Sequence, residues 1–181
     1  MRLEASLFSC TLTEDSWAQK WSWRNGARKT QRERSSWRRI PSFFFAAFIL
    51  PEGQSVPSIF GESPNNDIRP DGRFRIKTPA QTLYNDLPPK EAEYWASKII
   101  DQSYAVKTTK LTHASYRYVP STYVVCENDQ GPPPQYQEIF AKSAGATVLR
   151  IASGHSPMLS KTEELANMVA AAAQGAMKAI S

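Results

Sequence analysis

Three apolar stretches of the chain predict strands that are buried in a parallel sheet. Residues 43–50 (FFFAAFIL) form an uninterrupted apolar run with Pro51 and Gly53 just behind it, which is typical of a central strand covered on both faces. Residues 122–126 (TYVVC) predict a second buried strand, preceded by a proline and followed by a polar turn. Residues 146–152 (ATVLRIA) predict a third strand.

Three further segments predict helices. Residues 87–103 place prolines at a helix start and repeat apolar side chains on one helical face. That face consists of Ala92, Trp95, Ala96, Ile99 and Ile100. Residues 132–145 begin with prolines and end at Gly145, which also predicts a helix. The Ala- and Met-rich residues 162–180 predict a closing helix whose apolar face packs on the core.

The order of these elements predicts the fold class. Residues 51–74 are rich in Pro, Gly and Asn and predict turns rather than regular elements. The rest of the chain alternates strand, helix, strand and helix, which predicts an α/β fold with a parallel sheet. With 181 residues, of which 41% are hydrophobic, the chain has room for one moderate core.

The net charge of +5 is confined to the N-terminal part of the chain. Residues 1–42 hold nine basic and four acidic residues and four of the five tryptophans, whereas residues 43–181 are neutral. Basic side chains interleaved with aromatic ones are one signature of single-stranded nucleic-acid binding. The abrupt change of composition near Pro41 favours instead an atypical, poorly ordered segment over residues 1–42. We therefore expect no nucleic-acid partner.

Composition also argues against several kinds of site. Two cysteines and two histidines are too few for a disulfide framework or a zinc site, so we expect no structural metal. The longest apolar run falls far short of the roughly 20 residues that a membrane-spanning helix needs. Residues 1–20 lack the apolar stretch of a signal peptide. We therefore expect a cytoplasmic protein without a membrane partner.

Asp129 and His155 are the candidate catalytic residues. Asp129 follows the strand over residues 122–126, and His155 follows the strand over residues 146–152. Reactive groups collect at the carboxyl ends of parallel strands, and a right-handed crossover makes these two strand ends neighbours. An Asp that accepts a hydrogen bond from an imidazole forms the acid and base half of a nucleophilic triad. The alternative is a turn aspartate beside a loop histidine.

The other candidate residues are interpreted as structural. His113 has no acidic partner in view along the sequence and is expected at the surface or at a cap. Cys126 lies inside an apolar strand and is expected to be an inert buried thiol.

Residues 119–165 contain motifs that resemble those of α/β-hydrolases, in particular the branch with plant methylesterases, hydroxynitrile lyases and fungal esterase-like proteins. In that branch a turn aspartate is followed by a proline, an aromatic residue paired with Gln, a Gly-His segment and an apolar stretch with Ser and Lys. The corresponding residues are Asp129, Pro134, Tyr136, Gln137, Gly154, His155, Met158, Leu159, Ser160 and Lys161.

The resemblance covers about residues 43–175. Residues 43–55 resemble the strand after the nucleophile helix of the family, and residues 83–103 resemble its helical cap. It implies a partial α/β-hydrolase fold in which residues 43–181 form one domain, with a cap over about residues 52–117. It also implies that Asp129 is the orienting acid and His155 the general base, with no cofactor.

The family's nucleophile is not found in this sequence. It is a serine in a Gly-x-Ser-x-Gly turn, which should lie upstream of Phe43. The motif does not occur in the chain, and residues 1–42 hold a single glycine, Gly26. Ser9 and Cys10 follow an apolar pair, but they lack the small neighbours that so tight a turn requires. The nucleophile is therefore unassigned.

Two functions remain open at this point. The resemblance implies hydrolysis of esters or related acyl compounds of small-molecule substrates, with lyase chemistry as a variant within the branch. In fungi such proteins often accompany small-molecule (secondary-metabolite) biosynthesis. The alternative is a truncated, catalytically inactive remnant, or a binding protein that uses the cap pocket without chemistry.

Overall fold

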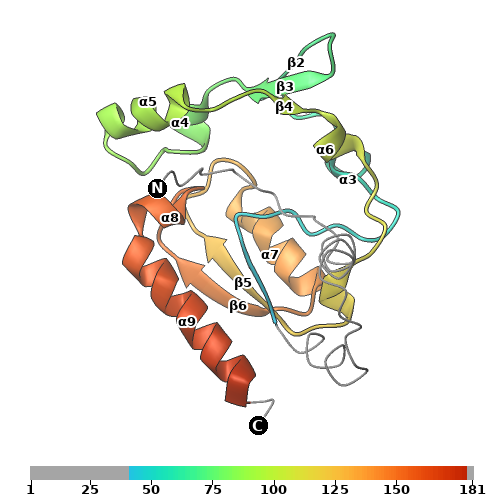
Figure 1. Cartoon of the computed structure of the whole chain (residues 1–181), viewed down its shortest axis with the longest axis vertical. Helices are drawn as coiled ribbons and strands as arrows, with labels where there is room; N and C mark the ends of the chain where they lie inside the picture. The colour runs from blue at the N-terminus through green and yellow to red at the C-terminus, as the bar shows by residue number, and fades with distance from the viewer. Residues whose placement is uncertain (1–40, 179–181) are drawn as a thin grey trace, which may run out of the picture.

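A three-stranded parallel sheet, in the order β1-β5-β6, forms the centre of the structure (Figure 1). The structure is a computed structural model that describes residues 41–178. β1 spans Ser42–Phe45, β5 spans Ser121–Cys126 and β6 spans Thr147–Ile151. The expectation for residues 1–42 lies outside the described residues, apart from its last two. The predicted parallel sheet of an α/β fold is confirmed.

The side chains of β5 alternate between the two faces of the sheet, and each face is covered by a helix. Tyr123 and Val125 pack against α7 (Pro134–Ser143), and Val124 packs against α9 (Thr162–Lys178). Figure 1 shows these two helices on opposite sides of the sheet. The last four residues of β5 are 0% exposed. Burial on both faces explains why this strand is an unbroken apolar run in the sequence.

The apolar run over residues 43–50 does not form one strand. β1 ends at Phe45, because Ala46 has a φ of 45°, in the left-handed region, and turns the chain out of the sheet. Ile49 and Leu50 are buried in the irregular stretch that follows. Among the described strands β1 lies at the edge and β5 at the centre, so the prediction of a central strand was wrong.

Residues 52–117 connect β1 to β5, and we call them the cap segment. Figure 1 shows the cap segment as an arc over the end of the sheet at which β5 and β6 finish. It contains a small antiparallel sheet, in the order β2-β3-β4, and several short helices. Its elements are α3 (Val56–Phe60), β2 (Asn66–Ile68), β3 (Arg73–Ile76), α4 (Pro79–Thr82), α5 (Pro89–Ser97), β4 (Gln102–Ser103), α6 (Ala105–Thr108) and the 3-10 turn η1 (Ser115–Arg117).

The prediction of turns over residues 51–74 was wrong for α3, for β2 and for the start of β3. These strands are joined by a turn in which Gly72 has a φ of 79°, a conformation that favours glycine. Phe74 is the one fully buried residue of β3, and β2 buries only Asn66. Strands this short and this exposed leave no repeated apolar position in the sequence to reveal them.

α5 is shorter than the helix predicted over residues 87–103. Ala92 packs with Leu83 and Tyr84 in the core of the cap segment, as the apolar spacing predicts. The helix ends near Lys98, and the chain then pairs with β3 as the short strand β4. Ile100, predicted on the apolar face, is 75% exposed, because it lies beyond the helix end.

α8 (Pro157–Ser160) and α9 complete the described chain. Leu165 of α9 is buried, and Met168 packs against the same cluster, whereas most alanines of α9 are exposed. Within residues 162–175 the predicted Ala/Met core face is therefore limited to the first turns of the helix. No helix within residues 41–178 is long and apolar enough to cross a membrane.

Tyr123→Phe is expected to destabilise the fold. The Tyr123 hydroxyl donates to the Ala47 carbonyl oxygen at 2.6 Å and accepts from the Ala47 N–H at 3.2 Å. Both groups lose their partner in the variant, so we expect the free energy of unfolding in urea to fall by about 1–3 kcal/mol. Tyr118→Phe, at a residue that is 72% exposed, is the control and should change it by less than about 0.5 kcal/mol. Equal stability of the two variants would contradict this prediction.

Candidate active site

Asp129 follows the carboxyl end of β5, and its side chain is fully buried. Its backbone N–H donates to the carbonyl oxygen of Cys126 at 3.3 Å, which turns the chain directly after the strand. Its Oδ1 accepts a hydrogen bond from the Gly131 N–H at 2.7 Å. A buried carboxylate requires such donors, because they replace the water that it has lost.

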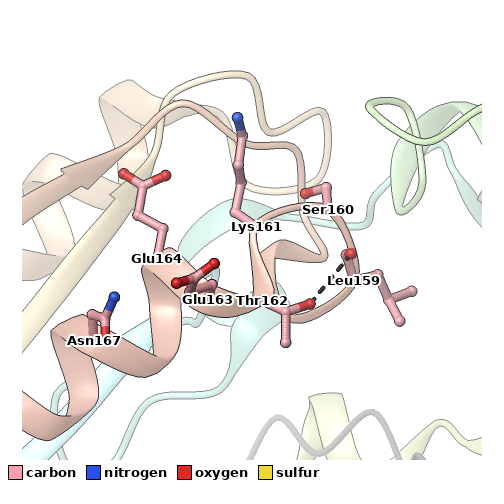
Figure 2. Close-up of a pocket in the computed structure, with 7 residues that line it drawn as sticks. All are labelled: Leu159, Ser160, Lys161, Thr162, Glu163, Glu164 and Asn167. Atoms are coloured by element: carbon pink, nitrogen blue, oxygen red, sulfur yellow. Dashed lines mark hydrogen bonds between the residues drawn. The ribbon is translucent and has the colours of Figure 1, made fainter.

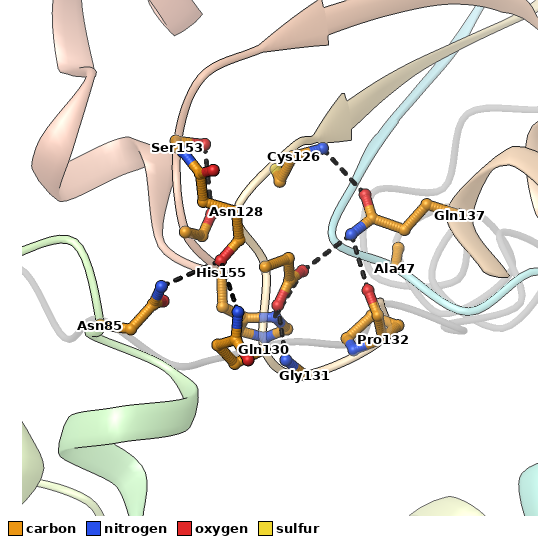
Figure 3. Close-up of polar contacts among 12 residues, drawn as sticks. Ala47, Asn85, Cys126, Asn128, Gln130, Gly131, Pro132, Gln137, Ser153 and His155 are labelled. Atoms are coloured by element: carbon orange, nitrogen blue, oxygen red, sulfur yellow. Dashed lines mark hydrogen bonds and ion pairs between the residues drawn. The ribbon is translucent and has the colours of Figure 1, made fainter. Parts of the chain in front are cut away.

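Gln137 supplies the second donor to this carboxylate. Its Nε2 donates to Asp129 Oδ2 at 2.9 Å. It also donates to the Pro132 carbonyl oxygen at 2.8 Å, a contact that Figure 3 shows. Its Oε1 accepts from the Cys126 N–H at 3.0 Å. Gln137 is 0% exposed and lies on the face of α7 that also buries Phe140. One side-chain amide therefore connects the end of β5, the following loop and α7.

His155 follows β6, the neighbour of β5, and completes the contacts of Asp129. Its Nδ1 lies 3.1 Å from both carboxylate oxygens. A carboxylate only accepts hydrogen bonds, so this contact assigns the ring proton to Nδ1 and leaves Nε2 as the acceptor. The His155 side chain is 16% exposed, and within residues 41–178 no hydrogen bond occupies Nε2. The ring is thus arranged to accept a proton at Nε2.

The loops that carry the two residues lie close together. The Asn128 N–H donates to the Ser153 carbonyl oxygen at 2.9 Å, which extends the pairing of β5 with β6 beyond the strands. A Cβ atom at Gly131 would lie 2.8 Å from His155 Nδ1 and 3.1 Å from Asp129 Oδ1. The absence of a side chain at Gly131 therefore makes room for the imidazole.

The other candidates from the sequence do not join this site. His113 is exposed and makes no side-chain hydrogen bond to another described residue. The Cys126 thiol is buried, and burial raises its pKa to about 11, so it remains protonated at neutral pH. Ser9 and Cys10 lie outside the described residues.

The role of Gln137 is not part of the sequence prediction, although a signal for it exists. Gln137, Phe140 and Ala141 are the buried residues of α7 and follow the spacing i, i+3 and i+4 of one helical face. A polar side chain among apolar ones on such a face needs buried partners. The role of Gly131, in contrast, has no signal in the local sequence.

The described residues offer no site for a metal ion. Within residues 41–178, no three His, Cys, Asp or Glu side chains gather as metal ligands would. An open hollow of about 520 Å³ lies where α8 meets α9 and is lined by residues that include Ser160, Lys161 and Glu164 (Figure 2). Neither Asp129 nor His155 lines it, so we do not assign the chemistry of the site to this hollow.

Comparisons with known proteins identify the family. A sequence model of the alpha/beta hydrolase family matches residues 32–168. The protein named alpha/beta hydrolase nvfD, from Aspergillus novofumigatus, is 34% identical over 143 residues, which cover 75% of this chain and 57% of that protein. The chain belongs to the alpha/beta hydrolase family, as its motifs predict. It spans little more than half the length of this relative.

Solved structures of esterases and hydrolases share the fold. Polyneuridine aldehyde esterase is similar with a TM-score of 0.54 and 20% identity, over 71% of this chain and 60% of the esterase. A pyrethroid hydrolase from Sphingobium faniae JZ-2 is similar with a TM-score of 0.61 and 13% identity, over 91% of this chain and 79% of the hydrolase. At these identities the similarity establishes the fold alone.

Gln137→Leu is expected to be strongly destabilising. The variant removes one donor from Asp129 and leaves the Cys126 N–H and the Pro132 carbonyl oxygen unpaired in the interior. We expect the free energy of unfolding in urea to fall by about 3 kcal/mol or more. Gln135→Leu is the matched control, because Gln135 is exposed on the same helix and makes no side-chain hydrogen bond within the described residues. A loss no larger than that of the control would contradict the structure.

Cys126 is expected to react slowly with thiol reagents in the folded protein. With its pKa raised to about 11, roughly a hundredfold less of this thiol is ionised at pH 8 than of an ordinary cysteine. Mass spectrometry should therefore find carbamidomethylation of Cys126 by iodoacetamide at least about a hundredfold slower in buffer than in concentrated urea. The reaction in buffer should accelerate as the pH rises toward 11. Similar rates in buffer and urea would show that the thiol is accessible.

Proposed function

We propose that this chain carries the acid and base of a Ser-His-Asp ester hydrolase that acts on a small-molecule substrate. Asp129 is the orienting acid and His155 the general base. The observation that carries the proposal is the 3.1 Å contact of His155 Nδ1 with the buried Asp129 carboxylate. Membership of the alpha/beta hydrolase family and the esterases among the similar structures support acyl chemistry. The resemblance to fungal esterase-like proteins supports a role in small-molecule biosynthesis.

The proposed mechanism uses the free nitrogen of His155. A serine hydroxyl attacks the ester carbonyl carbon and gives its proton to Nε2 of His155, while Asp129 stabilises the resulting imidazolium. The same proton then passes to the alcohol oxygen as the ester C–O bond breaks and leaves an acyl-enzyme. Water repeats the sequence on the acyl-enzyme, releases the carboxylic acid and restores the serine. The donors from Gly131 and Gln137 hold Asp129 in place before the reaction begins.

The absence of a Gly-x-Ser-x-Gly motif from the chain supports a second candidate function. A His-Asp pair without a nucleophile and oxyanion donors retains little of the usual rate acceleration. The second candidate is therefore a binding protein, or a catalytically inactive relative of the esterases, that keeps the pair without turnover.

A fluorophosphonate probe and a p-nitrophenyl ester test the proposal on the purified chain. We expect the probe to label a serine, and we expect Asp129→Asn to lower kcat/KM for the ester by about 10³–10⁴ because the imidazole loses its orienting acceptor. His155→Gln should abolish both labelling and hydrolysis. His113→Gln and Asp67→Asn, at exposed residues, are the controls and should leave both unchanged.

The outcomes separate the two candidate functions. Wild-type protein without serine labelling or hydrolysis would favour the binding protein. Hydrolysis that survives His155→Gln would overturn the role of the pair. Translation of the coding DNA ahead of the Ser42 codon in all frames adds a test that needs no protein. A Gly-x-Ser-x-Gly motif there would favour the enzyme, and its absence would favour the second candidate.

A further inference from the structure

Two adjacent residues of the cap segment contact the two loops that carry Asp129 and His155. They are Asn85 and Asp86, in the loop between α4 and α5. Asn85 Nδ2 donates to the carbonyl oxygen of Asn128 at 2.9 Å, which Figure 3 shows. Asp86 Oδ2 accepts from the backbone N–H of Gly154 at 2.5 Å. Each contact thus falls on the residue directly before a member of the pair.

The cap segment lies very close to the loop that carries His155. A Cβ atom on Gly154 would lie 2.3 Å from Asn85 Oδ1 and 2.7 Å from Asp86 Oδ1. The φ of Gly154 is outside the left-handed region, so close packing rather than backbone conformation requires glycine here.

The burial of the Asp86 carboxylate is not explained by a gain in stability. Its Oδ1 is buried and has no hydrogen-bond partner among the described residues. Burial of an unpartnered carboxylate oxygen is unfavourable for folding. The remaining oxygen accepts from the Gly154 N–H, so the contact with this loop is the one hydrogen bond that the side chain makes among the described residues.

We propose that Asn85 and Asp86 are positioning residues, which hold the two loops from the cap segment so that His155 Nδ1 and Asp129 stay within hydrogen-bond distance. Both contacts are made to backbone atoms next to the pair, so a loop that moves by about 1 Å moves its side chain by a similar distance. A shift of that size is enough to break a hydrogen bond between the two side chains. The consequence for catalysis rests on the proposed function, whereas the positioning itself does not.

The Nδ1 proton of His155 provides a readout that does not depend on activity. The chain has only two histidines, His113 and His155, so the imidazole N–H signals of the full chain labelled with ¹⁵N-histidine are simple to assign. An Nδ1 proton held by a carboxylate gives a far-downfield NMR signal, and His155→Gln identifies it by its loss. Rapid exchange with water removes this signal when the hydrogen bond opens.

Two isosteric variants should give opposite results. Asn85→Asp replaces the donor to Asn128 by an acceptor without a change of shape, and we expect it to abolish the Nδ1–H signal. Asp86→Asn keeps an acceptor for the Gly154 N–H, and we expect it to retain the signal. Asp86→Ala, which removes the acceptor, should lose it. If the esterase activity exists, Asn85→Asp and Asp86→Ala should lower kcat by about 10² with little change in KM.

The controls come from the same cap segment. Asn65→Asp and Asp67→Ala alter exposed residues whose side chains make no hydrogen bond within the described residues, and both should keep the signal. Circular dichroism and thermal melting verify that each variant is folded. Gly154→Ala replaces any variant that does not fold. Its added methyl group pushes the cap segment away from the loop of His155, so it should also lose the signal. A signal that persists in folded Asn85→Asp and Asp86→Ala, or one absent from the wild type, would overturn the positioning role. If the positioning role is right and only the proposed function is wrong, the wild-type protein shows the Nδ1–H signal but no esterase activity.

Discussion

The side-chain amide of Gln137 joins three parts of the fold, because it bonds the end of β5, the loop after it and the Asp129 carboxylate. All of these groups are buried, so each would be costly without its partner. Gln137 lies one helical turn before Phe140, which packs against Tyr123 and Val125 of the sheet. The packing that seats α7 therefore also sets the position of the amide. The packing of α7 on the sheet therefore also determines where the Asp129 carboxylate is held.

The parallel pairing of β5 with β6 brings His155 close to Asp129. In this register Cys126 lies opposite Ile151, so both strands finish at the same edge. Asp129 follows three residues after Cys126, and His155 follows four residues after Ile151. Loops this short have little freedom, and the backbone contact from Asn128 to Ser153 restricts them further. The two side chains meet because the strands are neighbours and because Gly131, in the first loop, leaves room for the imidazole.

This explains which parts of the structure could be predicted from the sequence. β5 and β6 follow from apolar stretches, α7 follows from the prolines at its start and Gly145 at its end, and the proximity of the loops follows from the handedness of the crossover. The end of β1 could not be predicted, because residues 43–50 are apolar whether they form a strand or an irregular stretch that packs on the core. The contacts of Asn85 and Asp86 join residues 43 and 68 positions apart in the chain, and no local pattern encodes them. Gln137 could be predicted only in part, since the sequence places it on an apolar helical face but does not indicate its hydrogen-bond partners.

The loops of both members of the pair contact the cap segment, but their side chains are held differently. Asp129 takes its donors from Gly131, in the loop after β5, and from Gln137 of α7. The loop of His155 contacts the cap segment through Gly154, and α8, which follows it, places Leu159 against the core of the cap segment. The cap segment therefore contacts the loop of each member, through Asn128 directly before Asp129 and through Gly154 directly before His155. The Asp129 carboxylate has further donors in Gly131 and Gln137, whereas the His155 imidazole is held by Asp129 alone among the described residues, so its orientation depends on the distance between the two loops.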